Sequence, residues 1–315
     1  MAAPLAALAP LRRRRVRRRI LIGLIALVVL VLVAVGGLTG YLYVQGTAPP
    51  AGNSDYVALG SSFGAGPGVA TRATDSPTMC IRSNDNYAHI LAHMRGLNLT
   101  DAMCSGAVTK DVLVGGQYFQ PAQLDAVKRN TKLVTVTIGG NDVSYLGNIF
   151  AWSYANAPSA MPAFWRLAGT CNAKSSAQVE RAFSHLEQNM DDIAAGVHKR
   201  APQARLVFVD YTTVLPDSGT CKQVPLTDAQ MHTGRDIAQR LSAITQKVAQ
   251  ETHADLVLGS RLTHGHDVCS ADPWVFGFQF PSNPMAYGPL AYHPKEQAMQ
   301  AIAGALDKLL NTPRT

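Results

Sequence analysis

The chain has 315 residues, 47% of them hydrophobic and 16% charged, which is enough apolar material for one large domain and an appendage. Its formal net charge is +7, but seven arginines at positions 12–15 and 17–19 carry that excess, because without them 28 − 7 = 21 basic residues balance 21 acidic ones. This distribution excludes a nucleic-acid-binding face on the folded domain, since such a face needs clustered positive charge there.

An uncharged apolar segment, Ile20 to Val44, directly follows the arginines. As a helix its 25 residues extend about 37 Å, enough to cross a hydrocarbon core of about 30 Å. Arginines on its amino side stay in the cytoplasm, which places the rest of the chain outside. The segment is longer than a usual signal core, which favours an uncleaved signal anchor. A cleaved secretory signal, processed at Ala34-Val35-Gly36, is the alternative.

These features divide the chain into five regions. Residues 1–19 form a basic cytoplasmic tail, 20–44 the transmembrane signal anchor, 45–53 a linker with Pro49-Pro50, 54–310 a folded domain and 311–315 a C-terminal tail. We expect the protein at the cell membrane as a single-pass protein with the domain extracytoplasmic, or secreted if the N-terminal segment is cleaved.

Strands and helices alternate through the folded domain. β-branched and apolar runs predict strands at 54–59, 97–103, 133–138, 205–210 and 255–258. Helical spacing predicts helices at 87–94, 121–129, 176–199, 228–252 and 294–310, the last with Pro294 at its first position. Loops are expected at 66–80, 144–170 and 216–227. The alternation predicts an α/β fold, a three-layer α/β/α sandwich around a mostly parallel sheet.

Four short motifs stand where predicted strands end or the last helix begins. They are Gly60-Ser61-Ser62-Phe63-Gly64, Cys104-Ser105-Gly106-Ala107, Ile138-Gly139-Gly140-Asn141-Asp142 and His293-Pro294. Each alone fits an ordinary loop, but the carboxyl ends of parallel strands meet at one edge of a sheet, where sites form. In this order the motifs resemble the SGNH (GDSL-type) hydrolase family of esterases and lipases, from Ser54 to Leu310. Two further segments, Cys80-Ile81-Arg82-Ser83 and Gly265-His266-Asp267-Val268-Cys269, resemble its secreted, disulfide-containing bacterial branch. The resemblance implies a flavodoxin-like sandwich.

Ser62 and His293 are the catalytic residues that the resemblance implies. A serine hydroxyl becomes nucleophilic when a histidine takes its proton. Ser62 rather than Ser61 fits the nucleophile because it precedes Phe63, as the family serine precedes leucine; Ser61 stands where the family has aspartate. His293 fits the base by its proline neighbour and its place before the last helix, although a His-Pro pair there can also serve as a mere cap.

The oxyanion hole is expected to consist of the backbone N–H groups of Ser62 and Gly106 and the side-chain amide of Asn141. Such donors stabilise the negative charge that develops on the carbonyl oxygen in the transition state. Asp142 is interpreted as a residue that shapes the Asn141 turn by hydrogen bonding.

The group that orients His293 departs from the family pattern. Relatives usually carry aspartate three residues before the histidine, where this chain has Leu290. We expect the backbone carbonyl of Leu290 to take that role, since it can fix the tautomer of the imidazole. Asp267 or Asp272 is the alternative.

The five cysteines suit an exported domain, which can keep disulfides. The resemblance pairs Cys80 with Cys104 and Cys221 with Cys269, and leaves Cys171 as a free thiol or an intermolecular bridge. The spacing of His264, His266 and Cys269 also resembles zinc ligands, but a structural site needs four ligands close together. No metal and no cofactor are therefore expected, and His89 and His93 are interpreted as helix-surface residues.

The favoured function is a serine hydrolase that cleaves carboxylic acyl esters near the outer membrane face. The aromatic side chains of 144–170 suit either the domain core or the wall of an acyl pocket. Two alternatives remain open: a deacetylase of cell-envelope glycans with the same machinery, and a non-catalytic envelope-binding protein that retains the fold. The sequence leaves the oligomeric state open.

Overall fold

The computed structural model of the chain describes residues 9–47, 54–156, 173–279 and 288–312, with residues 9–17 as backbone only. Five parallel strands form one sheet in the order β2-β1-β3-β4-β5. They are β1 Tyr56–Gly60, β2 Leu99–Asp101, β3 Leu133–Thr137, β4 Arg205–Val209 and β5 Asp255–Val257. The expected parallel α/β sheet is confirmed, although β2 is shorter than the predicted strand at 97–103.

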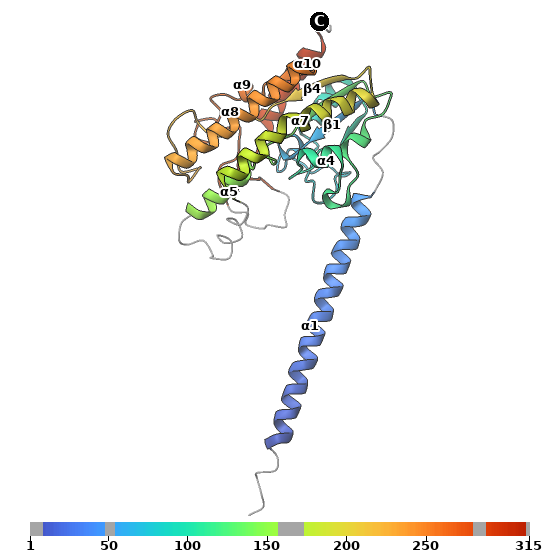
Figure 1. Cartoon of the computed structure of the whole chain (residues 1–315), viewed down its shortest axis with the longest axis vertical. Coiled ribbons are helices and arrows are strands. Elements are labelled where there is room, and N and C mark those ends of the chain that lie inside the picture. Colours follow the sequence, from blue (N-terminus) through green and yellow to red (C-terminus); the bar gives the residue numbers. More distant parts are fainter. Residues whose placement is uncertain (1–8, 48–53, 157–172, 280–287, 313–315) are drawn as a thin grey trace, which may run out of the picture.

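Helices cover both faces of this sheet (Figure 1). Helices α7 Ser176–Arg200 and α8 Asp228–Glu251 pack on one face, and α3 Tyr87–Arg95 and α10 Glu296–Leu310 on the other. The shorter helices are α2 Ser62–Ala65, α4 Thr109–Leu113, α5 Tyr145–Asn156 and α9 Gly259–Leu262, with 3-10 turns η2 Gln117–Phe119 and η3 Gln123–Ala126.

The alternation of side chains along the strands explains the three layers. In β1, Tyr56 and Ala58 belong to the core against α3 and α10, whereas Val57 and Leu59 belong to the core against α7 and α8. All five residues of β1 and all five of β3 are buried, as expected of parallel strands covered on both faces.

Three local predictions are wrong. The loop predicted at 144–170 begins with helix α5; its apolar residues point in all directions, because the helix is packed on several sides, so helical periodicity is missing from the sequence. The helix predicted at 121–129 is only the four-residue turn η3. Pro294 precedes α10 instead of opening it, since Lys295 is the N-cap residue.

Helix α1, Ala9–Gly46, extends away from the domain as a long rod (Figure 1). Within it, Arg18–Gly46 is the one helix of the described chain that is long and apolar enough to cross a membrane, judged by length and composition alone. The helix continues into the first two positions of the predicted linker at 45–53, where Gly46 is buried against the domain. Residues 48–53 lie outside the described residues.

Candidate active site

Ser62 lies where strand β1 ends and the chain turns sharply. Gly60, with φ of +141°, closes the strand, and a Cβ atom there would lie 2.2 Å from the carbonyl oxygen of Thr137, so only glycine fits. The side-chain amide of Gln123 clamps Gly60 by accepting from its N–H at 2.7 Å and donating to its carbonyl at 3.0 Å. Ser62 then opens the four-residue helix α2 and is only 7% exposed.

The imidazole of His293 reaches Ser62 from the loop before α10. Its Nε2 lies 2.8 Å from Oγ of Ser62, which is hydrogen-bonding distance. His293 is 3% exposed, and the rings of Phe63 and Phe150 lie beside it, with centroids 5.2 and 6.4 Å away. The structure thus brings together two residues that are 231 positions apart in the chain.

The carbonyl of Ala291, and not that of Leu290, orients His293. The Ala291 oxygen lies 2.9 Å from Nδ1, and because a carbonyl only accepts, Nδ1 carries the proton and Nε2 is free to accept from Ser62. The Leu290 carbonyl instead accepts the backbone N–H of His293 at 3.2 Å. Tyr292, with φ of +61°, turns the chain so that the carbonyl two residues before the histidine faces the ring. The prediction of Leu290 is therefore wrong by one residue.

Neither aspartate considered as an alternative touches His293. Asp267 accepts the backbone N–H of Cys269 at 2.8 Å. Asp272 accepts from the indole of Trp274 at 3.0 Å and lies 3.4 Å from His266. Both carboxylates thus form their hydrogen bonds within the loop around Cys269.

Burial dominates the electrostatics of His293. It lowers the pKa of the imidazole from 6.5 to about 4, and the hydrogen bond to the Ala291 carbonyl only partly offsets this effect. The ring is therefore neutral at neutral pH, the state in which Nε2 can accept a proton.

Hydrogen bonds join the Gly106 and Asn141 turns to each other and to the Ser62 turn. The side-chain nitrogen of Asn141 donates to the Ala107 carbonyl at 2.9 Å, which uses one of its two N–H bonds. Asp142 accepts from both the backbone N–H and the hydroxyl of Thr109, at 3.1 and 2.5 Å. These contacts agree with the interpretation of Asp142, and burial raises the pKa of its carboxyl. The N–H of Cys104 donates to the Gly60 carbonyl at 3.0 Å.

Tyr211, which follows β4, is a site residue that sequence reasoning missed. Its oxygen accepts the backbone N–H of Gly140 at 3.0 Å and lies 2.8 Å from Oγ of Ser61, a hydrogen bond in which either hydroxyl can donate. Its ring lies 4.4 Å from that of Phe63, centroid to centroid. Tyr211 therefore connects the Ser62 turn to the turn that carries Asn141. Its position directly after the strand predicted at 205–210 could have indicated a site residue, because sites form at the carboxyl ends of parallel strands.

The structure contains the two expected disulfides, Cys80–Cys104 and Cys221–Cys269. The first fixes the segment that leads into Ser105 and Gly106. The second disulfide contains the Cys269 sulfur that a zinc site with His264 and His266 would need. The spacing of these three residues therefore does not indicate a metal site. Cys171 lies outside the described residues.

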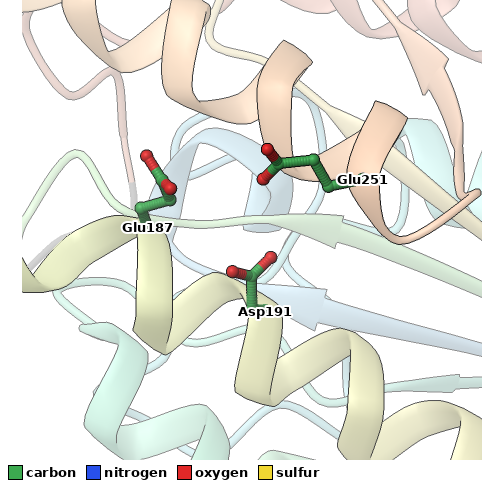
Figure 2. Close-up of side chains that lie close together, drawn as sticks. All are labelled: Glu187, Asp191 and Glu251. Atoms are coloured by element: carbon green, nitrogen blue, oxygen red, sulfur yellow. The ribbon is translucent and has the colours of Figure 1, made fainter.

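Three carboxylates gather on α7 and α8: Glu187, Asp191 and Glu251, with oxygens within 4.8 Å of one another (Figure 2). Lys247 forms ion pairs with Glu187 and, at 3.6 Å, with Glu251. Burial and the two neighbouring negative charges raise the pKa of the Asp191 carboxyl. The lysine ammonium supplies a counter-charge to these carboxylates.

Comparison with known proteins agrees with this architecture. Residues 58–301 match the GDSL-like Lipase/Acylhydrolase family. "Lipase 2" of Streptomyces coelicolor is 34% identical over 250 residues, which cover 74% of this chain and 81% of that protein. "Lipase" of Streptomyces rimosus is 28% identical over 244 residues, covering 75% and 81%.

Solved structures show the same fold. The crystal structure of the extracellular lipase from Streptomyces rimosus superimposes with a TM-score of 0.63 at 25% identity, over 81% of this chain and 99% of that one. That of phospholipase A1 from Streptomyces albidoflavus NA297 gives 0.64 at 24% identity, over 82% and 99%, and supports the fold alone. The protein is therefore an ester hydrolase of the lipase and esterase type. It belongs to the GDSL-like Lipase/Acylhydrolase family.

Proposed function

We propose that the protein is a membrane-anchored serine esterase that cleaves acyl esters through an acyl-enzyme on Ser62, with His293 as the general base. The observation that carries the proposal is the 2.8 Å contact between Oγ of Ser62 and Nε2 of His293, with the tautomer fixed by the Ala291 carbonyl. A nucleophile, a base and a group that orients the base are the parts that covalent ester hydrolysis requires.

The reaction proceeds in two proton-balanced stages. Nε2 takes the proton of Ser62 as Oγ bonds to the acyl carbon, and the imidazolium then returns it to the departing alcohol as the ester C–O bond breaks. Water then gives a proton to the same nitrogen as its oxygen bonds to the acyl carbon. The imidazolium returns that proton to Oγ of Ser62 as the Oγ–acyl bond breaks and the acid leaves. The N–H groups of Ser62 and Gly106 and the free N–H of Asn141 stabilise the oxyanion in both stages.

Apolar surroundings favour an acyl chain over a sugar. Phe150 of α5 lies beside both His293 and Tyr292, with ring centroids 6.4 and 5.5 Å away. Tyr154, one turn further along α5, packs edge-to-face on Phe278 at 5.4 Å. Helix α5 lies on the side of the domain from which α1 extends (Figure 1). If α1 spans the membrane, helix α5 lies on the membrane side of the domain, which suits ester substrates with fatty acyl chains.

Labelling with a fluorophosphonate tests the chemistry. We expect covalent attachment at Ser62 in the full chain, loss of attachment in Ser62→Ala, and its retention in the matched variant Ser61→Ala. Absence of labelling in the folded wild-type protein would identify a non-catalytic binding protein instead.

Nitrophenyl esters from acetate to palmitate test the substrate class. Preference for medium or long chains supports lipid esters, whereas activity confined to acetate indicates a deacetylase. The anchor is tested by alkaline carbonate extraction of membranes from cells making the full chain. We expect the protein to stay in the pellet at its full length, and release into the medium of a chain cut at Ala34-Val35-Gly36 would show cleavage.

A further inference from the structure

The carboxyl end of α1 contacts the domain at two places, of which the first is the loop before Cys80. The hydroxyl of Tyr41 lies 2.7 Å from that of Thr78, and the side-chain oxygen of Gln45 accepts the backbone N–H of Thr78 at 2.7 Å. The Gln45 nitrogen also donates to the Tyr41 oxygen at 2.9 Å. The last turns of α1 are thus hydrogen-bonded to the catalytic domain.

The second contact is with the turn η2. The ring of Tyr43 packs edge-to-face on Phe119, with centroids 5.7 Å apart. Gly46 is buried, and a Cβ atom on it would lie 2.1 Å from the carbonyl oxygen of Tyr118. By contrast, a Cβ on Gly40 in the same helix would meet nothing within 4 Å. Only glycine at position 46 allows α1 to approach this turn.

Both contacts lead to one peptide bond in the candidate oxyanion hole. From Thr78 the path runs through the Cys80–Cys104 disulfide to Ser105, whose N–H donates to the Cys80 carbonyl at 3.1 Å. From η2 it runs through Gln117, whose side-chain nitrogen donates to the Ser105 carbonyl at 2.9 Å. That carbonyl and the N–H of Gly106 belong to the same planar trans peptide and point in opposite directions. Holding the Ser105 oxygen therefore sets the direction of the Gly106 N–H.

The turn η2 needs external support to keep this arrangement. Tyr118 and Phe119 have φ of +50° and +65°, a left-handed conformation that residues other than glycine seldom adopt. Such a conformation persists only where surrounding contacts hold it. Tyr43 and Gly46 of α1 lie directly against these two residues and supply such contacts.

We propose that Gln117 is a positioning residue for the oxyanion donor Gly106, and that the end of α1 keeps Gln117 in place. The inference rests on the proposed function, since it concerns the same oxyanion hole. It makes the attached helix part of the working enzyme: a chain that has lost α1 keeps Ser62 and His293 but holds its oxyanion loop less firmly.

To test the proposal, kcat and KM are measured for the full chain and its variants in detergent micelles, with a nitrophenyl ester as substrate. We expect Gly46→Ala to lower kcat by about threefold to tenfold, a fraction of the loss that follows removal of a whole oxyanion donor, with KM nearly unchanged. The matched variant Gly40→Ala should keep the wild-type kcat. Gln117→Ala, which leaves α1 intact, should lower kcat in the same way. This variant tests the proposal even if the Gly46→Ala protein does not fold.

The double variant Gly46→Ala/Gln117→Ala shows whether α1 acts on the oxyanion hole through Gln117. If α1 acts through Gln117, the Gly46→Ala/Gln117→Ala protein should lose no more kcat than the worse single variant. Wild-type kcat in either single variant, or losses that multiply, would overturn the proposal. Fluorophosphonate labelling of Ser62 separates the two failures, because normal labelling with unchanged kcat refutes only the role of α1 and Gln117.

Discussion

The hydroxyl of Tyr211 lies 2.8 Å from Oγ of Ser61, so a residue just after β4 supports the Ser62 turn at the end of β1. The same oxygen accepts the N–H of Gly140 at 3.0 Å. Ser61 stands where the family usually has aspartate, and the Tyr211 hydroxyl is the hydrogen-bond partner of the shorter side chain there. The turns that carry Ser62 and Asn141 are thus tied through one phenol.

Tyr211→Phe should lower the free energy of unfolding by about 1–3 kcal/mol, because the buried N–H of Gly140 and the hydroxyl of Ser61 lose their partner. Urea denaturation followed by circular dichroism measures the loss. Tyr145→Phe is the matched control, since the Tyr145 hydroxyl has no hydrogen-bond partner among the residues that the structure describes, and it should cost less. Equal stability of the two variants would show that the Tyr211 hydroxyl contributes nothing.

The acid limb of the pH–activity profile should lie near pH 4. Burial lowers the pKa of His293 to about 4, so the imidazole can accept the Ser62 proton at any higher pH, and kcat/KM should fall only as pH drops through that value. Quenched assays between pH 3.5 and 8 measure the profile. A limb near 6.5 would mean that the histidine is solvated in the working enzyme.

The same pKa shift makes stability depend on pH. Unfolded His293 binds a proton below about 6.5, whereas the folded protein does not until about 4, so the stabilising contribution is complete above 6.5 and is lost toward pH 4. The loss amounts to about 3 kcal/mol at most. His293→Gln removes this part of the pH dependence, which urea midpoints at pH 7 and pH 4.5 would reveal.

Asn141→Ala should lower kcat by roughly 100-fold or more at nearly unchanged KM, since an oxyanion donor acts mainly in the transition state. Asn141→Asp is the sharper variant. It keeps the size of the side chain, but its carboxylate cannot donate and places a negative charge beside the oxyanion, so its kcat should be lower still. Stopped assays with one nitrophenyl ester compare both. A variant with more than a tenth of wild-type kcat would remove Asn141 from the oxyanion hole.

The sequence predicted the sheet from local patterns, and the pairing of Ser62 with His293 from the resemblance to SGNH hydrolases. β-branched runs specify strands, and the motifs stand at strand ends, which a parallel sheet brings to one edge. The sequence did not predict which backbone carbonyl contacts His293. That contact depends on the positive φ of Tyr292, a conformation that no residue type in this segment dictates.

Non-local contacts were likewise beyond prediction. Tyr211 reaches Ser61 across 150 positions, and Gln117 reaches Ser105 only because η2 adopts left-handed conformations at two residues other than glycine. Helix α5 was missed for a different reason: packed on several sides, it lacks the one-sided apolar pattern by which surface helices are recognised.

The two disulfides should differ in what they do for activity. In the loop-entropy account, closing a loop between residues 24 apart contributes about 3 kcal/mol, and one between residues 48 apart about 4 kcal/mol. Cys80→Ala/Cys104→Ala and Cys221→Ala/Cys269→Ala should therefore destabilise the domain by similar amounts. Only the first pair leads directly to Ser105 and Gly106, so only its removal should also lower kcat.

Assays well below the unfolding temperature of each variant separate the two effects. We expect the Cys221→Ala/Cys269→Ala protein to keep its kcat while its unfolding midpoint falls. The Cys80→Ala/Cys104→Ala protein should lose both, because the carbonyl of Cys80 no longer holds the N–H of Ser105 in place. Equal kcat in both proteins would mean that Gln117 alone is enough to hold the oxyanion loop.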